Sequence, residues 1–160
     1  MRGLVHTGFM SLDGVVDSPG GGPGEGHHSG GWVVKDPEFV PEAWSRKGEE
    51  LTGTTGLMFG RRSYEAFAPV WPGSEDHAGY KLLPKYVVSS TLPDDALVDG
   101  WGPTTILRST DDVAALKQGA GGAIFNGDPR TPHALVDNPQ RIHVLAPGRP
   151  YRPRRSPAAG

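Results

Sequence analysis

The strongest chemical signal in the sequence is the run Leu57–Glu65, which reads LMFGRRSYE. An apolar segment of strand type leads into Gly60, and Arg61, Arg62 and Ser63 follow where a helix is expected to begin. Free main-chain N–H groups and the helix dipole favour an anion there, and arginines add forked, charge-assisted hydrogen bonds. The run therefore suits a phosphate. A plain strand–turn–helix, with solvated arginines and Ser63 as the helix cap, remains the alternative.

Two further segments carry groups that suit a nucleotide. Ser89 and Ser90 leave a predicted strand in the run VVSST, where they either bind a ribose phosphate or form a polar turn before Pro93. The run GGAIFNG ends at Gly127, and a strand that ends in glycine before a helix is compatible with a diphosphate. It is not the G-x-G-x-x-G fingerprint, so the sequence gives little support to a Rossmann domain.

Other polar residues carry weaker signals. Asp13 follows the first apolar segment, where it either faces a substrate or forms an ordinary turn with Gly14. His27 and His28 lie in a glycine-rich segment with no second cluster of ligands near them in sequence, so no metal site is predicted.

Strands and helices must position these groups, and the pattern of apolar residues predicts where these elements lie. Strands are predicted over 4–10, 57–59, 85–89, 104–107, 123–125 and 142–145. Helices are predicted from Asp36-Pro37, from Arg62-Ser63 to Ala68, and from Ser109 or Thr110 to Gln118. Strands that alternate with helices predict an α/β fold with a largely parallel sheet.

Composition narrows the class of protein. The 160 residues suit one domain, and the net charge of −2 gives no pull toward nucleic acid or an anionic membrane. The absence of cysteine excludes disulfides, thiolate catalysis and cysteine-based metal sites. No apolar run approaches the roughly 20 residues that cross a bilayer, and no signal-peptide pattern is present. We therefore expect a cytoplasmic protein.

Taken in order, the motifs resemble a known family. Ser11–Gly14 is followed by Gly31-Trp32, then by the Gly60–Glu65 block running on to Val70-Trp71-Pro72, and then by Lys85–Leu92 and Val113–Gly127. This order resembles the dihydrofolate-reductase-like family, in the branch that includes the reductase domain of riboflavin biosynthesis. The resemblance covers roughly residues 4–127, and its most specific part is the Gly60–Glu65 block with Val70–Pro72.

The resemblance implies a fold and a reaction. The fold is a three-layer α/β sandwich with a mixed, mostly parallel sheet flanked by helices. The reaction is hydride transfer from NADPH to a small heterocycle of pterin or aminouracil-ribitol type, in which the protein supplies position and electrostatics.

The resemblance also assigns roles to residues. Gly60, Arg61, Arg62 and Ser63 would hold the adenosine 2′-phosphate and the diphosphate. Ser89 and Ser90 would assist at the adenosine end, and Gly127 would approach the diphosphate from the other side. Asp13 would lie by the nicotinamide and the substrate, which makes it the best candidate for a catalytic residue.

The chain departs from the family after Gly127. Asp128-Pro129 stands where relatives have a small residue, and Pro129 has no N–H for a phosphate. The closing strands are largely missing, and the Arg/Pro-rich segment 146–160 has too little apolar surface to fold. We expect one reductase domain over 1–145, a disordered tail over 146–160 and a weakened family dimer, and we hypothesise a change of reading frame. The alternative is an inactive, truncated relative that retains at most nucleotide binding; an interaction module that works through the basic tail is a weaker one.

Overall fold

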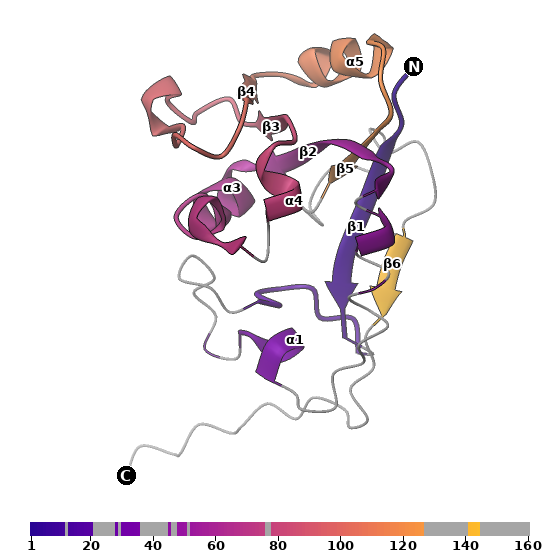
Figure 1. Cartoon of the computed structure of the whole chain (residues 1–160), viewed down its shortest axis with the longest axis vertical. Coiled ribbons are helices and arrows are strands. Elements are labelled where there is room, and N and C mark those ends of the chain that lie inside the picture. Colours follow the sequence, from indigo (N-terminus) through magenta and orange to yellow (C-terminus); the bar gives the residue numbers. More distant parts are fainter. Residues whose placement is uncertain are drawn as a thin grey trace.

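The computed structural model describes residues 1–11, 13–20, 28, 30–35, 45, 48–50, 52–75, 78–126 and 141–144. Six strands within these ranges form one sheet, in the order β4-β3-β2-β5-β1-β6 (Figure 1). The strands are β1 Leu4–Met10, β2 Thr54–Gly60, β3 Lys85–Val88, β4 Thr104–Leu107, β5 Ala123–Asn126 and β6 Arg141–Val144.

The described neighbouring strands all pair in parallel. The chain runs outward from β2 to β3 and β4, and then returns to place β5 between β2 and β1. The predicted α/β class with its mostly parallel sheet is confirmed. An antiparallel member, which a mixed sheet requires, does not occur among the described strands.

Four short helices accompany the sheet: α1 Trp32–Lys35, α3 Arg61–Phe67, α4 Ala78–Lys81 and α5 Thr110–Gln118. The sequence predicted α3 and α5 to within one residue at each end. It did not predict α1 or α4, each of which has only 4 residues and too few positions to show a helical period. The start of the helix expected at Asp36, the predicted tail over 146–160 and Gly127 lie outside the described residues.

The sheet is the middle of three layers, because alternate side chains of its strands enter two different cores. Leu57 and Phe59 of β2 pack with Tyr64 of α3 in one core. Met58, which lies between them in the strand, packs with Val113 of α5 in the other core. Helices α3 and α5 therefore cover opposite faces of the sheet, as the three-layer sandwich requires (Figure 1).

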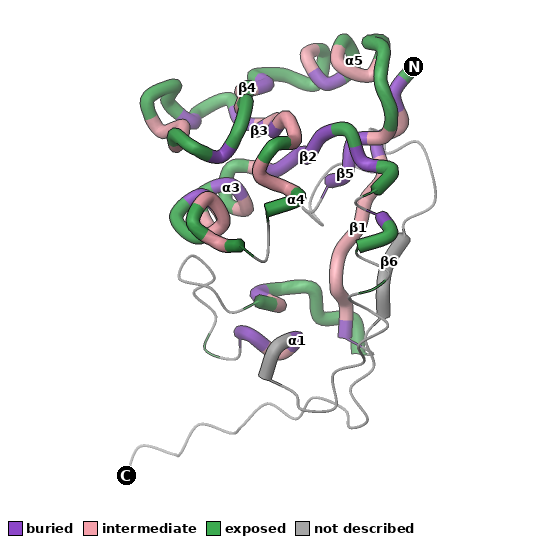
Figure 2. The backbone as a smooth tube through the Cα atoms, in the orientation of Figure 1, coloured by how far each residue is buried: buried purple, intermediate pink, exposed green. Residues whose placement is uncertain are grey.

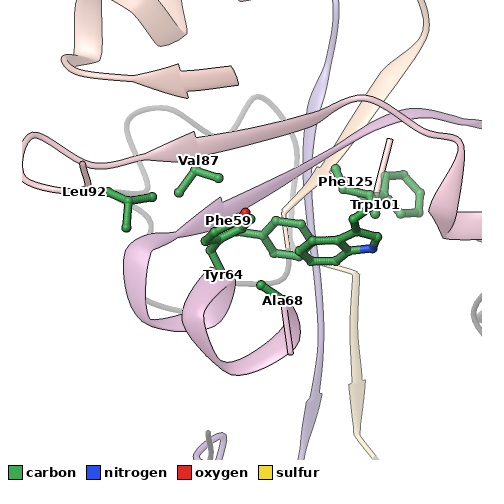
Figure 3. Packing of buried hydrophobic residues seen from close by; sticks show 8 residues of the cluster. Phe59, Tyr64, Ala68, Val87, Leu92, Trp101 and Phe125 are labelled. Carbon is green, nitrogen blue, oxygen red and sulfur yellow. The ribbon is translucent and has the colours of Figure 1, made fainter. Parts of the chain in front are cut away.

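Aromatic rings fill the core beneath α3. The Trp101 ring is completely buried and stacks on Phe59, with the ring centroids 5.5 Å apart, and on Tyr64, at 5.6 Å (Figure 3). The Tyr64 hydroxyl accepts a hydrogen bond of 2.9 Å from the Val98 main-chain N–H. This bond joins α3 to the connection between β3 and β4, and so fixes the helix that begins with Arg61.

Arg2 ties the amino ends of several strands together. Its guanidinium, in a residue that is only 7% exposed, donates to the Tyr86 hydroxyl on β3 at 3.2 Å and to Thr55 Oγ1 on β2 at 3.0 Å. It also donates to the Gly122 carbonyl before β5 at 3.3 Å. Each of these partners is neutral, so the interaction is a set of hydrogen bonds rather than an ion pair.

The glycines at the start of β5 make room for this arrangement. A Cβ on Gly122 would lie 2.7 Å from Thr55 Cγ2, and a Cβ on Gly121 would lie 3.0 Å from Arg2 Nε. Gly121 also has a φ of +136°, which favours glycine. The two glycines therefore serve packing at the amino edge of the sheet.

Replacing Arg2 is expected to destabilise the fold. Arg2→Met keeps the apolar stem but removes the hydrogen bonds of a buried guanidinium to Tyr86, Thr55 and Gly122, which costs about 2 kcal/mol in the free energy of unfolding. Urea denaturation at neutral pH measures the effect. Arg62→Met, which changes an exposed arginine, is the control, and equal stabilities of the two variants would contradict the role of Arg2.

Lys85 joins β3 to the end of α4. This residue is completely buried, and its Nζ donates to the Tyr80 and Lys81 carbonyls, each at 2.7 Å. The same Nζ lies 5.2 Å from the centre of the Trp101 ring. Burial lowers the pKa of Lys85 to about 8. The ammonium therefore satisfies the last carbonyls of a helix while it lacks the stabilisation that water would give it.

The shifted pKa of Lys85 predicts a pH dependence. Because the unfolded chain keeps its lysine protonated to about pH 10.4, the unfolded state binds more protons than the folded state between pH 8 and that value. The free energy of unfolding should therefore rise, by about 1–2 kcal/mol between pH 7.5 and 9.5, relative to the variant Lys85→Met. Urea denaturation of both proteins across this range measures the difference, and parallel pH profiles would contradict it.

Among the residues that the structure describes, no helix combines the length and the apolar character that crossing a bilayer requires.

Candidate functional site

Parallel pairing brings the carboxyl ends of the strands to one edge of the sheet. Gly60 at the end of β2 pairs in register with Val88 at the end of β3, and Met58 pairs with Asn126 at the end of β5. The order of the strands reverses between β2 and β5, and in open α/β sheets ligands bind outside the carboxyl ends at such a point. Gly60–Ser63, Ser89 and Ser90, the predicted cofactor residues that the structure describes, therefore lie at the carboxyl edge of the sheet.

Gly60 is both the last residue of β2 and the N-cap of α3. Its φ of −75° and ψ of 165° are open to any residue, and no side chain caps the helix. Of the plain strand–turn–helix alternative, only the Ser63 cap is wrong: Ser63 lies in the first turn and is half-buried. Arg61 and Arg62 are the first residues of α3, and both are exposed.

Arg61 is held by two neighbours. Its Nε forms an ion pair with Glu65 Oε1 at 2.7 Å, and its Nη1 donates to Thr91 Oγ1 at 3.0 Å. The second bond joins the start of α3 to the segment after β3, so two of the predicted cofactor segments do meet. The Arg62 side chain makes no hydrogen bond or ion pair within the described part of the chain.

The segment after β3 is a tight turn built on Ser89. The Ser89 hydroxyl, in a residue that is 9% exposed, accepts hydrogen bonds from the main-chain N–H groups of Thr91 at 3.3 Å and of Leu92 at 3.0 Å. Its own N–H donates to the Leu107 carbonyl at 2.9 Å. Ser89 therefore shapes the turn, whereas Ser90 at its tip is exposed.

Arg108 also belongs to this site, and sequence reasoning missed it. It follows β4 directly, at the same edge as the other arginines. Its Nη1 donates to the carbonyls of Ser89, at 3.3 Å, and of Leu92, and its Nη2 pairs with Asp94 Oδ1 at 2.7 Å. The available signal was an arginine immediately after a predicted strand. We name Arg61, Arg62, Arg108 and the turn Ser89–Leu92 the arginine corner.

The start of α5 completes the edge beside Arg108. Ser109 is the N-cap and forms a reciprocal capping box with Asp112, as predicted for a cap at this position. The Ser109 side chain, together with the main-chain N–H groups of Arg108 and Ser109, holds the pKa of Asp112 below its usual value. Asp112 therefore stays ionised and fixes the main chain of Arg108.

Asp13 lies apart from the arginine corner. It is exposed and accepts a hydrogen bond from the Ser11 hydroxyl, and the Gly14 N–H closes the predicted turn on the Ser11 carbonyl at 2.9 Å. β5 separates β1 from β2, so the two strands lie about 10 Å apart. The structure thus puts Asp13 at the same edge of the sheet without contact to the corner.

The segment that carries Asp13 is tied to α1. Trp32 Nε1 donates to the Asp17 carbonyl at 2.9 Å, and the Val33 N–H donates to the Pro19 carbonyl at 3.1 Å. β1 itself is only half-buried over most of its length, although it lies between two other strands (Figure 2). The carboxyl half of β1 is therefore accessible beside Asp13.

A buried carboxylate near β1 also escaped sequence reasoning. Glu50 is 8% exposed, and its Oε2 accepts a hydrogen bond of 2.8 Å from the Thr7 hydroxyl on β1. Burial, and then the charge of Glu50, raises the pKa of Tyr80. On the neighbouring strand, Asn126 is completely buried, with its Nδ2 3.5 Å from His6 Nδ1. No spacing in the sequence connects these residues.

Within the described part of the chain, the histidine, aspartate and glutamate side chains form no group of three that would hold a metal ion. His28 is exposed, and His27 lies outside the described residues.

Comparisons with known proteins give a structural likeness. No family model matches the chain, and no curated protein matches it. Among solved structures, the chain is similar to a "Putative riboflavin biosynthesis protein" from Shewanella sp. PV-4, with 19% sequence identity and a TM-score of 0.48. The alignment covers 79% of this chain and 65% of that one, so this chain spans less than two thirds of its neighbour's length. The likeness is distant.

Proposed function

We propose that the protein is an NADPH-dependent reductase that transfers hydride to a small heterocyclic substrate of pterin or aminouracil type. The observation that carries the proposal is the hydrogen bond of 3.0 Å between Arg61 and Thr91. This bond unites the arginines at the start of α3 with the hydroxyl-rich turn after β3, so cations and hydroxyls from two strands converge at the ligand-binding edge of the sheet.

The chemistry of the arginine corner favours a phosphate that carries two charges. Arg62 is exposed and makes no hydrogen bond or ion pair within the described residues, so its five N–H donors are open to a ligand. Ser90 is exposed at the tip of the neighbouring turn. A guanidinium beside a hydroxyl suits the forked, charge-assisted recognition of a phosphate such as the adenosine 2′-phosphate of NADPH.

The substrate end of the site lies along β1. NADPH, when bound, supplies the hydride, and its nicotinamide would lie toward β1 and away from the arginine corner. Asp13 is exposed at that end and held by Ser11. In this proposal Asp13 orients the substrate and assists the proton transfer that accompanies reduction.

The proposal predicts a preference for NADPH over NADH. Arg62→Ala should weaken NADPH binding by about 10–100-fold, the value of one or two hydrogen bonds to a charged group, while NADH binding changes little. Cofactor fluorescence titration measures both affinities. Lys81→Ala, which removes a cation before the amino end of β3, is the control. Equal loss of NADPH and NADH binding in the Arg62 variant would contradict recognition of the 2′-phosphate.

A second prediction concerns Asp13. Asp13→Asn keeps the shape of an exposed side chain, so thermal stability should be unchanged, while the rate of NADPH oxidation with a pterin or aminouracil substrate should fall by about 100-fold. Stopped-flow absorbance of NADPH measures the rate. An unchanged rate would remove Asp13 from the reaction.

Oxidation of NADPH distinguishes the reductase from the alternative of an inactive relative. That relative, which retains at most nucleotide binding, would never oxidise NADPH, whichever heterocycle is added. A folded protein that binds neither nicotinamide cofactor would exclude the reductase proposal altogether.

A further inference from the structure

We propose that Arg108 is the positioning residue of the arginine corner: it holds the turn Ser89–Leu92, the turn places Thr91, and Thr91 aims Arg61 toward the bound phosphate. The proposal rests on the proposed function, since it assigns a role within the same site. No sequence motif assigns a role to Arg108. A chain of contacts that joins the ends of β4, β3 and β2 indicates this role.

In the first step, Arg108 holds both ends of the turn Ser89–Leu92. One guanidinium nitrogen, Nη1, donates to the carbonyls of both Ser89, at 3.3 Å, and Leu92. These carbonyls belong to the first and last residues of the turn, so a single side chain fixes its two ends. The main chain of Arg108 is itself fixed, because its N–H donates to Asp112 Oδ2 at 2.8 Å.

The second step is the rigidity of the turn. From inside, the Ser89 hydroxyl accepts from the main-chain N–H groups of Thr91 and Leu92, at 3.3 and 3.0 Å. The side chain of Leu92, which is 1% exposed, is anchored in the core with Val87 and Trp101 (Figure 3). Because Leu92 is anchored in the core and Arg108 holds both ends of the turn, the position of Thr91 is fixed.

The third step passes from Thr91 to Arg61. Thr91 Oγ1 accepts from Arg61 Nη1 at 3.0 Å, and Glu65 holds Arg61 Nε at 2.7 Å. Two acceptors on different sides of a planar guanidinium set its orientation. Without Thr91, the exposed Arg61 would retain only the ion pair with Glu65, an exposed i,i+4 contact of small energy.

The ion pair between Arg108 and Asp94 contributes little to this positioning. It spans 2.7 Å, but the Arg108 side chain is 41% exposed and the Asp94 side chain 89% exposed. Exposed pairs of this kind are weak, whereas the carbonyl contacts on the inner side of the guanidinium constrain the main chain directly. Asp94 therefore provides a matched control: it touches the same guanidinium without holding the turn.

The test compares two probes by isothermal titration calorimetry. Adenosine 2′,5′-bisphosphate carries the 2′-phosphate, and adenosine 5′-monophosphate lacks it. The ratio of the two affinities measures the contribution of the 2′-phosphate, which is the group that Arg61 would contact. A general loss of stability would weaken the binding of both probes and would leave this ratio unchanged. We expect Arg108→Met to reduce the ratio about tenfold, and Thr91→Val to reduce it by a similar factor. Asp94→Asn should leave the ratio unchanged.

The double variant decides whether Arg108 acts through Thr91. If it does, Arg108→Met should reduce the ratio no further in a chain that already carries Thr91→Val. Losses that multiply in the double variant would overturn the proposal, as would an unchanged ratio in either single variant. Circular dichroism checks folding. If the Arg108 variant does not fold, the Thr91 variant decides alone, because it leaves the carbonyl contacts of Arg108 in place.

Failure of this proposal is distinguishable from failure of the proposed function. If the wild-type protein binds both probes equally, the arginine corner does not recognise a 2′-phosphate, and the proposed role of Arg108 fails as well. A wild-type protein that prefers the bisphosphate, with an Arg108 variant that prefers it equally, overturns the role of Arg108 alone.

Discussion

The parallel alignment of the strands is the constraint on which the rest of the structure depends. Because β2, β3, β4, β5 and β1 run in one direction, every segment that leaves a strand begins at the same edge of the sheet. Arg61, Ser89 and Arg108 are separated by many residues along the chain, yet each follows the last residues of a strand. Their convergence therefore follows from the topology of the sheet and needs no long-range recognition between loops.

Polar groups maintain this alignment from the opposite edge. Arg2 hydrogen-bonds to residues on β2, on β3 and just before β5, and Lys85 fixes the start of β3 to the end of α4. Both side chains are buried cations with neutral partners, which is costly unless every donor is well placed. The fold thus places these two buried cations at the amino edge and the exposed Arg61, Arg62 and Arg108 at the carboxyl edge.

The sequence predicts the scaffold better than it predicts the site. The strands and the two longer helices are visible because apolar periodicity is local, and the ends of β1, β2 and β3 are marked by a glycine or a hydroxyl residue. Arg108 and Glu50 were missed because their roles arise from contacts between distant segments: Arg108 with the turn after β3, and Glu50 with Thr7. Ser63 was assigned a possible capping role, but Gly60 is the N-cap residue and no side chain caps α3. Hydrogen bonds within the site were therefore the least predictable element.

Two of the three arginines at the carboxyl edge already carry an internal counterion, since Glu65 pairs with Arg61 and Asp94 with Arg108. An anion that binds Arg61 must compete with Glu65 for its guanidinium, whereas the pair of Arg108 with Asp94 lies on a residue that positions the turn. Dissolved electrolyte screens the attraction of the arginines for an incoming anion, but it also weakens the exposed pair of Arg61 with Glu65 that opposes its entry. The two effects partly cancel, so affinity at this edge should decline less steeply with ionic strength than three uncompensated arginines would suggest. Internal counterions would in this way make the affinity of the arginine corner for an anion less sensitive to the ionic composition of its surroundings.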